Sequence, residues 1–432
     1  MKNLLAGRRP DLEDHTHYHG VDSAEKHLRV DLALEEFLSK IRRVGSEEVL
    51  VGKSFERILY SDLRSKSNLP QRARSTRDGY AVKISRKSSP PGSIFRLIGD
   101  VRIGVAPNVL LRAGEAVLIA TGSHIPKGAN SVLMREYSLV EGRNLRATRP
   151  IQIGENILKA GEDISKGSTV LSRGEQLRAQ HIALLTEIGI RKVRVFKKPR
   201  IAFFSTGDEL IDAEKKIPPG SPKIFDSNRP FVKSLITELG AQAVDLGIAK
   251  DNYDQIKRKV IAGLAFDALI LSAGSSMGER DYASRAIESI KGIHLLTHGV
   301  AMRPSSPTGL AVFKGRPVIL LPGFPTSAIV SFFVFAMPAI MKISGRKSTK
   351  PPLIQARMLD RYEGKLGVKH YVRVRVEPNH GGYAAAIVRP TEAFHSSWMG
   401  RANGIAIFDE ESSPVKPGQI VNVMLIAEIR DS

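Results

Sequence analysis

The chain has 432 residues, 42% hydrophobic and 25% charged, and its lack of cysteine excludes disulfides, thiolate metal sites and thiol nucleophiles. Its 65 Lys and Arg outnumber its 44 Asp and Glu, giving a net charge of +21 and an isoelectric point near 10.1. Such an excess suits nucleic acid, a membrane surface or a small anionic substrate. With 6% aromatic residues and no long run of like charges, we expect a generally basic surface, and nucleic-acid binding is the less favoured alternative.

Length and hydropathy indicate several soluble domains. A chain this long exceeds one compact core, so we expect three or four domains. No uncharged apolar run reaches the roughly 18 residues that span a bilayer, and the longest candidate, Ala328–Ile343, falls short. The first 26 residues lack the apolar core of a signal peptide. We therefore expect a cytoplasmic protein without a membrane anchor.

The N-terminal half is predicted to be mainly β. Apolar residues three and four apart predict a helix over Asp31–Ile41, with Asp31 as a plausible cap. A strand at Glu48–Val51 is expected next, followed by a helix that starts near Ser54. Glycine-containing turns every 8 to 12 residues across 83–200 favour small sheets, with strands at 116–120 and 131–134. A helix over 174–188 closes this region.

Residues 199–345 alternate continuous apolar strands with helices, which predicts a doubly wound parallel sheet. The expected strands are 201–204, 243–248, 268–271 and 318–321. The expected helices are 228–239, 253–265, 281–290 and 326–343. From Lys350 onward the alternation of Tyr371–Val376 and a last strand within 417–426 predict a small antiparallel β domain.

Three strand ends of the predicted sheet carry unusual loops, namely Ser205–Leu210, Ser272–Asp281 and Pro322–Ala328. Ligands of open α/β sheets bind beyond the carboxyl ends of the strands. The Gly/Ser loop can direct several backbone N–H groups and hydroxyls toward an anion. A tight turn explains any one loop equally well, but three at one edge indicate a phosphate-bearing ligand.

Carboxylates are expected at the same edge, from Glu209, Asp226, Asp251 and Asp281. Converging beside a phosphate loop, they would hold Mg²⁺; the alternative for Asp226 and Asp281 is helix N-capping. Arg303 could clamp an oxyanion or be an ordinary surface residue. The alternating His15, His17 and His19 offer a less favoured metal site.

Ten segments in order and in register resemble the MoeA/gephyrin E-domain family, the molybdopterin molybdenumtransferases, over roughly residues 30–430. They are Thr76–Val82, Ala120–Gly122, Pro150–Ile157, Ala160–Ile164, Ser205–Leu210, Phe225–Asn228, Ser272–Tyr282, Met302–Pro304, Leu321–Pro325 and Arg401–Gly404.

The resemblance implies a multidomain fold of α/β plus β, with a central MogA-like α/β domain, flanking β-rich domains and a C-terminal β domain. It implies domain I at 30–64 and 152–198 (extended and dimer-forming), domain II at 65–151, domain III at 199–345 and domain IV at 346–432. It further implies a homodimer that inserts molybdate or tungstate into adenylylated molybdopterin, with Mg²⁺-dependent release of AMP. A molybdopterin adenylyltransferase is a further expected partner.

The resemblance also implies site residues. The catalytic carboxylates would be Asp78, Glu209, Asp251 and Asp281, with Glu209 and Asp281 as metal ligands and Asp78 acting across the dimer. The substrate-binding residues would be Thr121, Asp163, Ser272, Gly274, Ser276, Gly278, Arg303, Ser306, Pro322, Gly323, Pro325, Ser396 and Ser397.

Several ligand loops depart from the family pattern. Ala273 stands at a common glycine, Ser306 at a common lysine, Phe324 at a common asparagine and Arg77 at a common methionine. These changes lie on the ligand side and not in the scaffold. The alternative function is therefore a non-catalytic protein that binds molybdopterin or serves as a scaffold.

Overall fold

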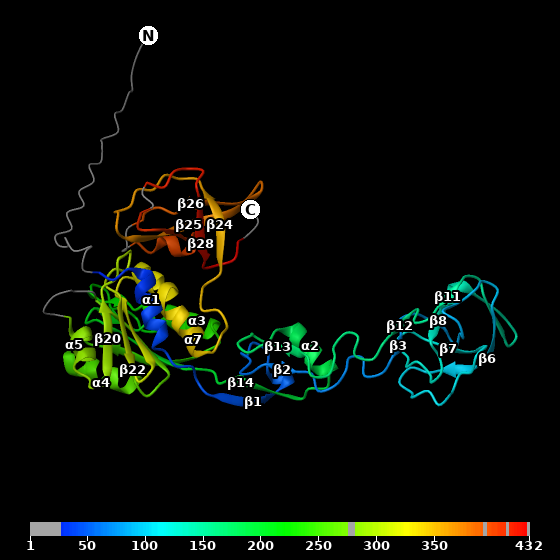
Figure 1. Cartoon of the computed structure of the whole chain (residues 1–432). Helices are drawn as coiled ribbons and strands as arrows, with labels where there is room; N and C mark the ends of the chain where they lie inside the picture. Colours follow the sequence, from blue (N-terminus) through cyan, green and yellow to red (C-terminus); the bar gives the residue numbers. More distant parts are fainter. Residues whose placement is uncertain (1–26, 275–280, 392–394, 412–413, 430–432) are drawn as a thin grey trace, which may run out of the picture. The chain divides into compact units, whose positions relative to one another are not determined.

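The computed structural model describes residues 27–274, 281–391, 395–411 and 414–429. The chain divides into two compact units. Unit 1 comprises residues 1–42, 199–343 and 349–432, and unit 2 comprises residues 43–198 and 344–348. Figure 1 shows the elements of each unit. The domain boundaries expected within these units remain predictions.

A six-stranded α/β sheet forms the core of unit 1, in the order β18-β15-β19-β23-β22-β20. Its strands are β15 (Arg200–Thr206), β18 (Gln242–Ala249), β19 (Ala268–Ala273), β20 (Ile293–His298), β22 (Gly309–Phe313) and β23 (Arg316–Pro322). The first four in spatial order are parallel, as predicted. The expectation of an entirely parallel sheet is wrong at one edge, because β22 and β20 run antiparallel. A short turn at Lys314–Gly315 joins β22 to β23, and an antiparallel pair needs no crossover helix.

Helices cover both faces of this sheet, which confirms the doubly wound arrangement. They are α1 (Val30–Ser39), α3 (Asn228–Glu238), α4 (Tyr253–Gly263), α5 (Tyr282–Glu288), α6 (Pro325–Ser331) and α7 (Met337–Ile343). Helices α4 and α5 pack with Phe204 and Leu271 in one apolar cluster. The side chains of Phe203 and Ile270, which alternate with those two, face α3 at Val232.

The single helix predicted over 326–343 is wrong, because the helical run at 325–343 is not one continuous α-helix. A π-helical segment, η4 (Phe332–Ala336), separates α6 from α7, and all five of its residues are buried. By length and composition the run Pro325–Ile343 could cross a membrane, yet 89% of its most apolar window is buried inside the protein. It has the burial of a core helix.

The C-terminal sheet of unit 1 is a small closed barrel, in the order β21-β25-β26-β24-β28-β27 with β25 also paired to β27. Its strands are β21 (Met302–Arg303), β24 (Leu353–Met358), β25 (Lys369–Asn379), β26 (Gly382–Ile387), β27 (Gly404–Phe408) and β28 (Ile420–Leu425). The expected antiparallel sheet is only partly correct, because β24 pairs with β26 and β21 with β25 in parallel. Strand β21 extends this sheet with residues from the loop that follows β20.

Helix α1 belongs to unit 1, where it packs against α7 and the β20–β22 edge. The predicted cap is wrong: Arg29 occupies the N-cap position, and no side chain caps the helix. Asp31 lies in the first turn, and its Oδ2 accepts a hydrogen bond from the ammonium of Lys369 at 2.8 Å. Lys369 also pairs with Asp409 at 3.2 Å, so a buried lysine of the barrel connects to α1.

Unit 2 contains a six-stranded sheet in the order β8-β4-β7-β6-β10-β9 and four two-stranded pairs. The sheet strands are β4 (Gly79–Val82), β6 (Ile94–Val101), β7 (Glu115–Ile119), β8 (Ser131–Met134), β9 (Ser138–Glu141) and β10 (Asn144–Ala147). The pairs are β1 (Ser46–Leu50) with β14 (Lys192–Phe196), β2 (Leu63–Arg64) with β13 (Thr169–Leu171), β3 (Arg74–Ser75) with β12 (Ile157–Leu158), and β5 (Ser88–Ser89) with β11 (Ile151–Gln152).

The helix predicted from Ser54 is wrong. A single 3-10 turn, η2 (Val51–Lys53), precedes Ser54, and the backbone then bonds to residues 175–177. The N–H groups of Glu56 and Leu59 donate to the carbonyls of Leu177 and Glu175, at 2.8 and 2.9 Å. These bonds hold residues 174–178 extended, so α2 (Ala179–Glu187) is shorter than predicted.

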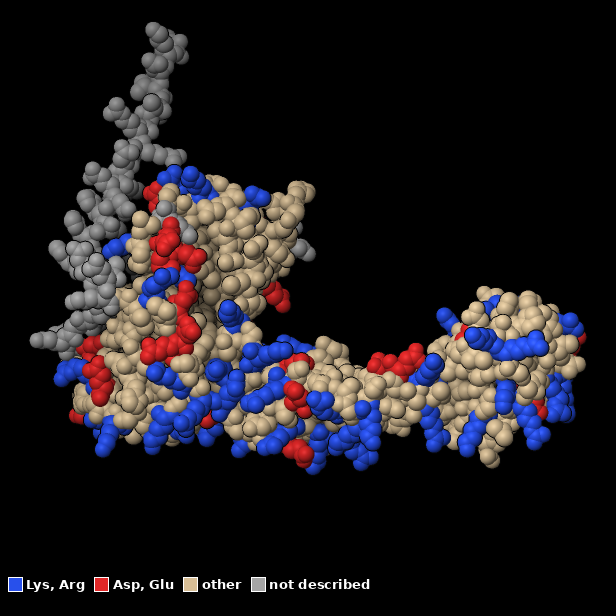
Figure 2. Space-filling view, in the orientation of Figure 1, with Lys and Arg blue, Asp and Glu red and all other residues tan. Residues whose placement is uncertain are grey.

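The positive charge is concentrated in unit 2. This unit has 30 Lys and Arg against 14 Asp and Glu, an excess of 16 out of the net +21. In Figure 2 these side chains line the lower face of unit 2 in the view. The basic surface expected from composition is therefore uneven, because only a small part of the excess lies on the α/β and barrel domains.

Candidate functional site

The three strand ends singled out in the sequence lie side by side. β15, β19 and β23 are neighbours in the sheet, with Ser205 paired to Ser272 and Ser272 paired to Leu321. One step further, Ala273 pairs with Pro322. A Cβ on Gly323 would lie only 3.2 Å from the Ala273 carbonyl oxygen, so glycine allows the last two loops to approach.

Asn228 joins these loops through its side-chain amide, although it was not among the predicted site residues. Its Nδ2 donates to Ser272 Oγ at 2.7 Å and to the Gly323 carbonyl at 2.8 Å. Ser272 Oγ in turn donates to the Pro322 carbonyl at 3.3 Å. Asn228 is 6% exposed, so these bonds are shielded from water. The Phe225–Asn228 motif contained this residue, but only the fold shows which groups its side-chain amide bonds to.

Asp226 lies one residue before Ser227, the N-cap of α3, and its carboxylate bonds the first N–H groups of the helix, so the capping alternative is right about its bonding but not about its position. Its Oδ1 accepts the backbone N–H groups of Asn228 and Arg229 at 3.1 and 3.2 Å, and the residue is 2% exposed. Its carboxylate is therefore engaged in orienting Asn228. It is not among the carboxylates exposed at the sheet edge.

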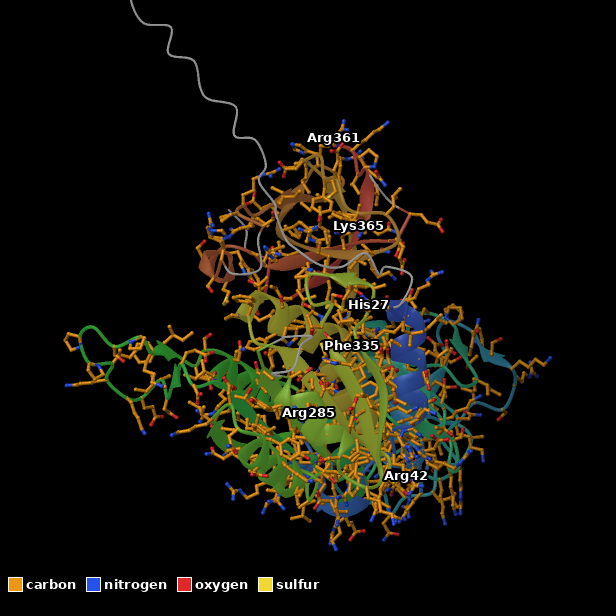
Figure 3. All side chains as sticks on the ribbon, turned by 90° about the vertical axis from the view of Figure 1, so that its left-hand side faces the viewer. His27, Arg42, Arg285, Phe335, Arg361 and Lys365 are labelled. Carbon is orange, nitrogen blue, oxygen red and sulfur yellow. The ribbon has the colours of Figure 1, made fainter. Side chains whose placement is uncertain are left out.

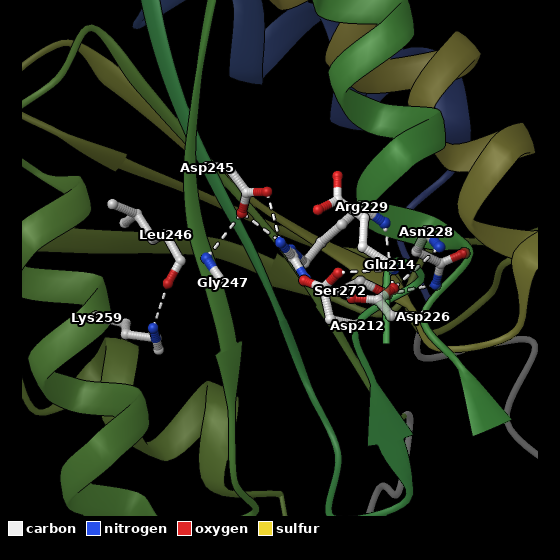
Figure 4. Close-up of polar contacts among 10 residues, drawn as sticks. All are labelled: Asp212, Glu214, Asp226, Asn228, Arg229, Asp245, Leu246, Gly247, Lys259 and Ser272. Carbon is white, nitrogen blue, oxygen red and sulfur yellow. Dashed lines mark hydrogen bonds and ion pairs between the residues drawn. The ribbon is translucent and has the colours of Figure 1, made fainter. Parts of the chain in front are cut away.

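The Arg229 guanidinium lies among three aspartates (Figure 4). It donates to Asp245 at 2.6 and 2.9 Å and to Asp212 at 3.0 Å, and it lies 3.8 Å from Asp226. The Glu214 N–H and Arg229 both lower the pKa of Asp212. Burial alone would raise the pKa of Asp245, but bonds from Arg229 and Gly247 bring that pKa below its ordinary value. The network anchors the loop after β15 to α3 and β18.

Two aspartates at the ends of β15 and β18 face each other. The Asp208 N–H donates to Asp251 Oδ2 at 3.3 Å, and the Asp251 N–H donates to Asp208 Oδ1 at 3.4 Å. The exposed Glu209 carboxylate folds over Gly207, where a Cβ would lie 2.7 Å from Glu209 Oε2. Glu209 and Asp251 thus lie on neighbouring strand ends.

Asp281 is the N-cap of α5, again as the capping alternative predicted. Its Oδ1 accepts the Ser284 N–H at 3.1 Å. Its Oδ2 lies 3.6 Å from Nδ1 of His298, a residue that sequence reasoning did not select. Gly274 is exposed after β19, and the predicted Ser276 and Gly278 lie outside the described residues. Across the described ranges, no group of three His, Cys, Asp or Glu side chains is placed to hold a metal ion.

The loop between β20 and β22 carries Arg303, the expected oxyanion clamp, and Ser306, an expected substrate-binding residue. Arg303 is exposed in the short strand β21, and it pairs with His370 of the barrel. Ser306 is half-buried, and its Oγ lies 3.3 Å from Nδ1 of His27, which Figure 3 labels beside the start of α1. Ser305 Oγ donates to the Ser327 carbonyl at 2.7 Å, which attaches the loop to α6.

The barrel contributes a segment beside the last strand-end loop. Pro322 ends β23, and Pro325 occupies the first turn of α6. Trp398 Nε1 donates to Thr326 Oγ1 at 2.8 Å, and this hydroxyl donates to the His395 carbonyl at 3.0 Å. The predicted Ser396 and Ser397 are exposed next to this contact, at the start of η5 (Ser397–Gly400).

One buried cation near that segment was also missed. Arg373, on β25, is 2% exposed, and its guanidinium lies 5.5 Å from the Trp398 ring. Its Nη2 donates to the Thr391 carbonyl at 2.5 Å. The alternation of β25 was predicted, but burial of the Arg373 side chain depends on closure of the barrel.

Unit 2 holds the remaining predicted residues. Asp78 Oδ1 accepts both the N–H and the hydroxyl of Thr121, at 2.7 and 2.9 Å. These two bonds lower the pKa of Asp78. Asp163 lies in a different loop, exposed, and its N–H donates to the Leu69 carbonyl at 3.2 Å. The structure therefore brings together the first two residues of this set.

The fold and the strand-end loops define a multidomain protein with a doubly wound α/β domain and a C-terminal β-barrel. Family models match the chain as MoeA N-terminal region (domain I and II) over residues 28–189, probable molybdopterin binding domain over 202–342, and MoeA C-terminal region (domain IV) over 355–426. The chain belongs to the MoeA family.

Proteins of similar sequence and structure match most of the chain. A molybdopterin molybdenumtransferase of Haemophilus influenzae is 31% identical over 75% of this chain and 80% of its own length. A putative molybdopterin biosynthesis protein of Methanocaldococcus jannaschii is 28% identical over 91% and 95%. A crystal structure of a MoeA protein from Pyrococcus horikoshii superposes with a TM-score of 0.79 at 29% identity, covering 93% of this chain and 99% of that one.

Proposed function

We propose that this protein is a molybdopterin molybdenumtransferase, which inserts molybdate or tungstate into adenylylated molybdopterin and releases AMP. The observation that supports this best is the meeting of three strand-end loops at one edge of the sheet, two of which Asn228 bonds together, within the domain matched as a probable molybdopterin binding domain. Several curated relatives carry the same activity in their names. The proposal places the reaction in molybdenum cofactor biosynthesis, in the cytoplasm.

The loops at the carboxyl edge would bind the anionic parts of the substrate. Ser272, Gly274 and Gly323 would offer backbone N–H groups to phosphate oxygens, while the buried Ser272 hydroxyl donates to the Pro322 carbonyl. Gly323 has no side chain that would separate the loops after β19 and β23, and Asn228 holds Ser272 in place through a hydrogen bond. These residues thus bind and orient the pterin phosphate and the adenylyl group.

The carboxylates suit a magnesium ion that is shared with the substrate. Mg²⁺ is usually held by one or two carboxylates, several waters and substrate phosphates, and not by an all-protein cage. The exposed Glu209, the paired Asp251 and the capping Asp281 offer single carboxylates of this kind. When bound, the ion would neutralise charge at the phosphoryl oxygens. We assign Glu209 and Asp281 as its ligands.

The oxyanion would bind between the β20–β22 loop and the barrel. Arg303 supplies an exposed guanidinium, which can hold a tetrahedral oxyanion at two points. The Ser306 hydroxyl and the exposed pair Ser396 and Ser397 are the neutral donors of this part of the site. Pro322 and Pro325 shape the loop between them.

We further propose a homodimer in which Asp78 and Thr121 act on the partner's substrate, with Asp163 near the same cleft. The support is that all three lie in unit 2, whereas the strand-end site lies in unit 1. Mixing inactive Asp78→Asn and Asp281→Asn chains should then restore part of the activity. A molybdopterin adenylyltransferase would deliver the adenylylated substrate.

Release of AMP tests the proposed function directly. Full-length protein is incubated with adenylylated molybdopterin, Mg²⁺ and molybdate or tungstate, and AMP is measured. Asp251→Asn should abolish most release, whereas Asp254→Asn, an exposed aspartate three residues away, should not. If the unmodified protein binds molybdopterin without releasing AMP, the non-catalytic alternative holds, which the exposed Phe324 in the last loop favours.

A further inference from the structure

His298 and Asp281 form a contact between two elements that are distant along the chain. Asp281 Oδ1 is occupied by the Ser284 N–H at 3.1 Å, and Asp281 Oδ2 faces His298 Nδ1 at 3.6 Å. The Ser284 hydroxyl lies 3.2 Å from Nδ1 and 3.3 Å from Nε2 of the same ring. Both sides of the carboxylate are therefore bounded, one by the start of α5 and the other by the imidazole.

Irregular pairing between β20 and β22 directs the ring to this place. The register shifts between Leu295 and Thr297, so one extra residue in β20 precedes His298. Such a bulge reverses the alternation of side chains that follows it. His298 then pairs with Gly309, where a Cβ would lie 3.4 Å from the ring carbon Cδ2. Glycine at this position leaves room for the imidazole.

We propose that His298 is a positioning residue for Asp281. At 3.6 Å the ring nitrogen lies just beyond hydrogen-bond range of Oδ2, and rotation of the carboxylate about its Cβ–Cγ bond would move Oδ2 away from this polar neighbour. With Oδ1 held by the backbone, one orientation of Oδ2 remains. This inference rests on the proposed function, in which Asp281 is a carboxylate of the reaction. His298 itself does not touch the substrate.

The competing explanation is that Asp281 is a helix cap and His298 fills space beside it. In that case replacing His298 changes stability alone. In the proposed role, replacing His298 changes the chemical step and the affinity of the carboxylate for a divalent ion. Mutation of a residue that contacts a metal-ligating group typically lowers activity or metal affinity by about 10–100-fold.

The test compares His298→Leu, which removes the ring nitrogens, with His298→Gln, which keeps a polar N–H. His294→Leu, at an exposed position of the same strand, is the matched control. For each full-length variant we would measure kcat and KM for AMP release, Mn²⁺ binding by electron paramagnetic resonance, and the midpoint of thermal unfolding. We expect His298→Leu to lower kcat and Mn²⁺ affinity by at least tenfold with KM little changed, His298→Gln to restore most of both, and His294→Leu to change neither.

The positioning role would be overturned if His298→Leu and the parent had equal kcat and equal Mn²⁺ affinity. It would also be overturned if, in both His298 variants, kcat and Mn²⁺ affinity fell only in proportion to the fall in the midpoint of thermal unfolding. Asp281→Asn separates this failure from failure of the proposed function. If Asp281→Asn abolishes AMP release while His298→Leu is fully active, only the positioning role is wrong. If the parent releases no AMP, the proposed function is wrong, and Mn²⁺ binding still decides the role of His298.

Discussion

The indole of Trp398 donates a hydrogen bond to Thr326, joining the β-barrel to the first turn of α6 at 2.8 Å. Both residues are buried, and the Thr326 hydroxyl donates its own hydrogen bond to the His395 carbonyl. The contact fixes the segment carrying Ser396 and Ser397 beside the loop Pro322–Pro325. The oxyanion part of the proposed site thus depends on two hydrogen bonds that meet at the Thr326 hydroxyl.

Trp398→Phe should weaken that junction while keeping most of its packing. Loss of a buried bond is expected to cost about 1 kcal/mol in the free energy of unfolding. We also expect a higher molybdate concentration for half-maximal AMP release, because the serine segment loses its anchor. Thr326→Val, which also removes the bond to the His395 carbonyl, should have at least as large an effect, and the double variant should add little to it. Fully additive effects, measured by chemical denaturation, would show that the two side chains act independently.

Asn228→Ala should be among the most damaging substitutions in unit 1 outside the carboxylates. It leaves the Gly323 carbonyl and the Ser272 hydroxyl without their donor, which typically costs about 1–3 kcal/mol in a buried site. Binding of molybdopterin should weaken at the same time, because the loops after β19 and β23 are no longer tied. Asn422→Ala, on the exposed face of β28, is the control. Unchanged molybdopterin affinity in Asn228→Ala would contradict the role assigned to the junction.

Thr121→Val should raise the pKa of Asp78 toward its ordinary value, because it removes one of the two bonds that lower it. A carboxylate with a lowered pKa contributes stability above its ordinary pKa and loses it as the pH falls through the folded value. Since Asp78 is exposed, the useful observable is its own titration, followed by NMR of labelled aspartate carboxyls. Thr121→Ser, which retains a hydroxyl, should keep the lowered pKa.

Lys369 should make unit 1 sensitive to alkaline pH. Burial acts to lower its pKa, but bonds to Asp31 and Asp409 outweigh burial and raise it. The stabilising charge is therefore fully present below the ordinary lysine pKa, about 10.4, and is lost as the pH rises through the higher folded value. Thermal unfolding between pH 9 and 12 should show this loss in the parent. Lys369→Met should lack that dependence, and Lys369→Arg should shift it upward.

Arg303→Ala should impair oxyanion use far more than loss of an ordinary surface arginine. Removing a charge-assisted contact from a partly desolvated site is expected to cost about 1–3 kcal/mol in binding. Conversely, Ser306→Lys should tighten the apparent molybdate constant by adding a cation. Arg361→Ala, on the exposed part of the barrel labelled in Figure 3, is the matched control. If both site variants leave molybdate dependence unchanged, the oxyanion binds elsewhere.

The strongly periodic parts of the chain could be predicted from sequence, and the irregular ones could not. The four parallel strands were predicted because each is a continuous apolar run. β20 was missed because its residues are mostly half-buried and give no clear alternation. The helix predicted from Ser54 failed because its backbone bonds with Leu177, more than a hundred residues away.

For the site, topology alone brought the loops after β15, β19 and β23 to one edge of the sheet. The pairings of Arg229 with three aspartates, and of His298 with Asp281, depend on turns and a bulge that no local pattern encodes. Hence the convergence of the three loops was predictable, while the residues that orient their side chains were not.

The π-helical segment Phe332–Ala336 has a consequence for how this chain tolerates length changes. A π turn contains one residue more than an α turn, and one residue corresponds to about 100° of rotation around a helix axis. α7 is thus turned relative to a straight continuation of α6, and both pack inside the protein. Deleting a single residue at 332–336 would leave a smoother helix with the same apolar composition, yet it would rotate Ile340 and Ile343 away from the core. An uninterrupted α-helix would therefore be less stable here than the interrupted one.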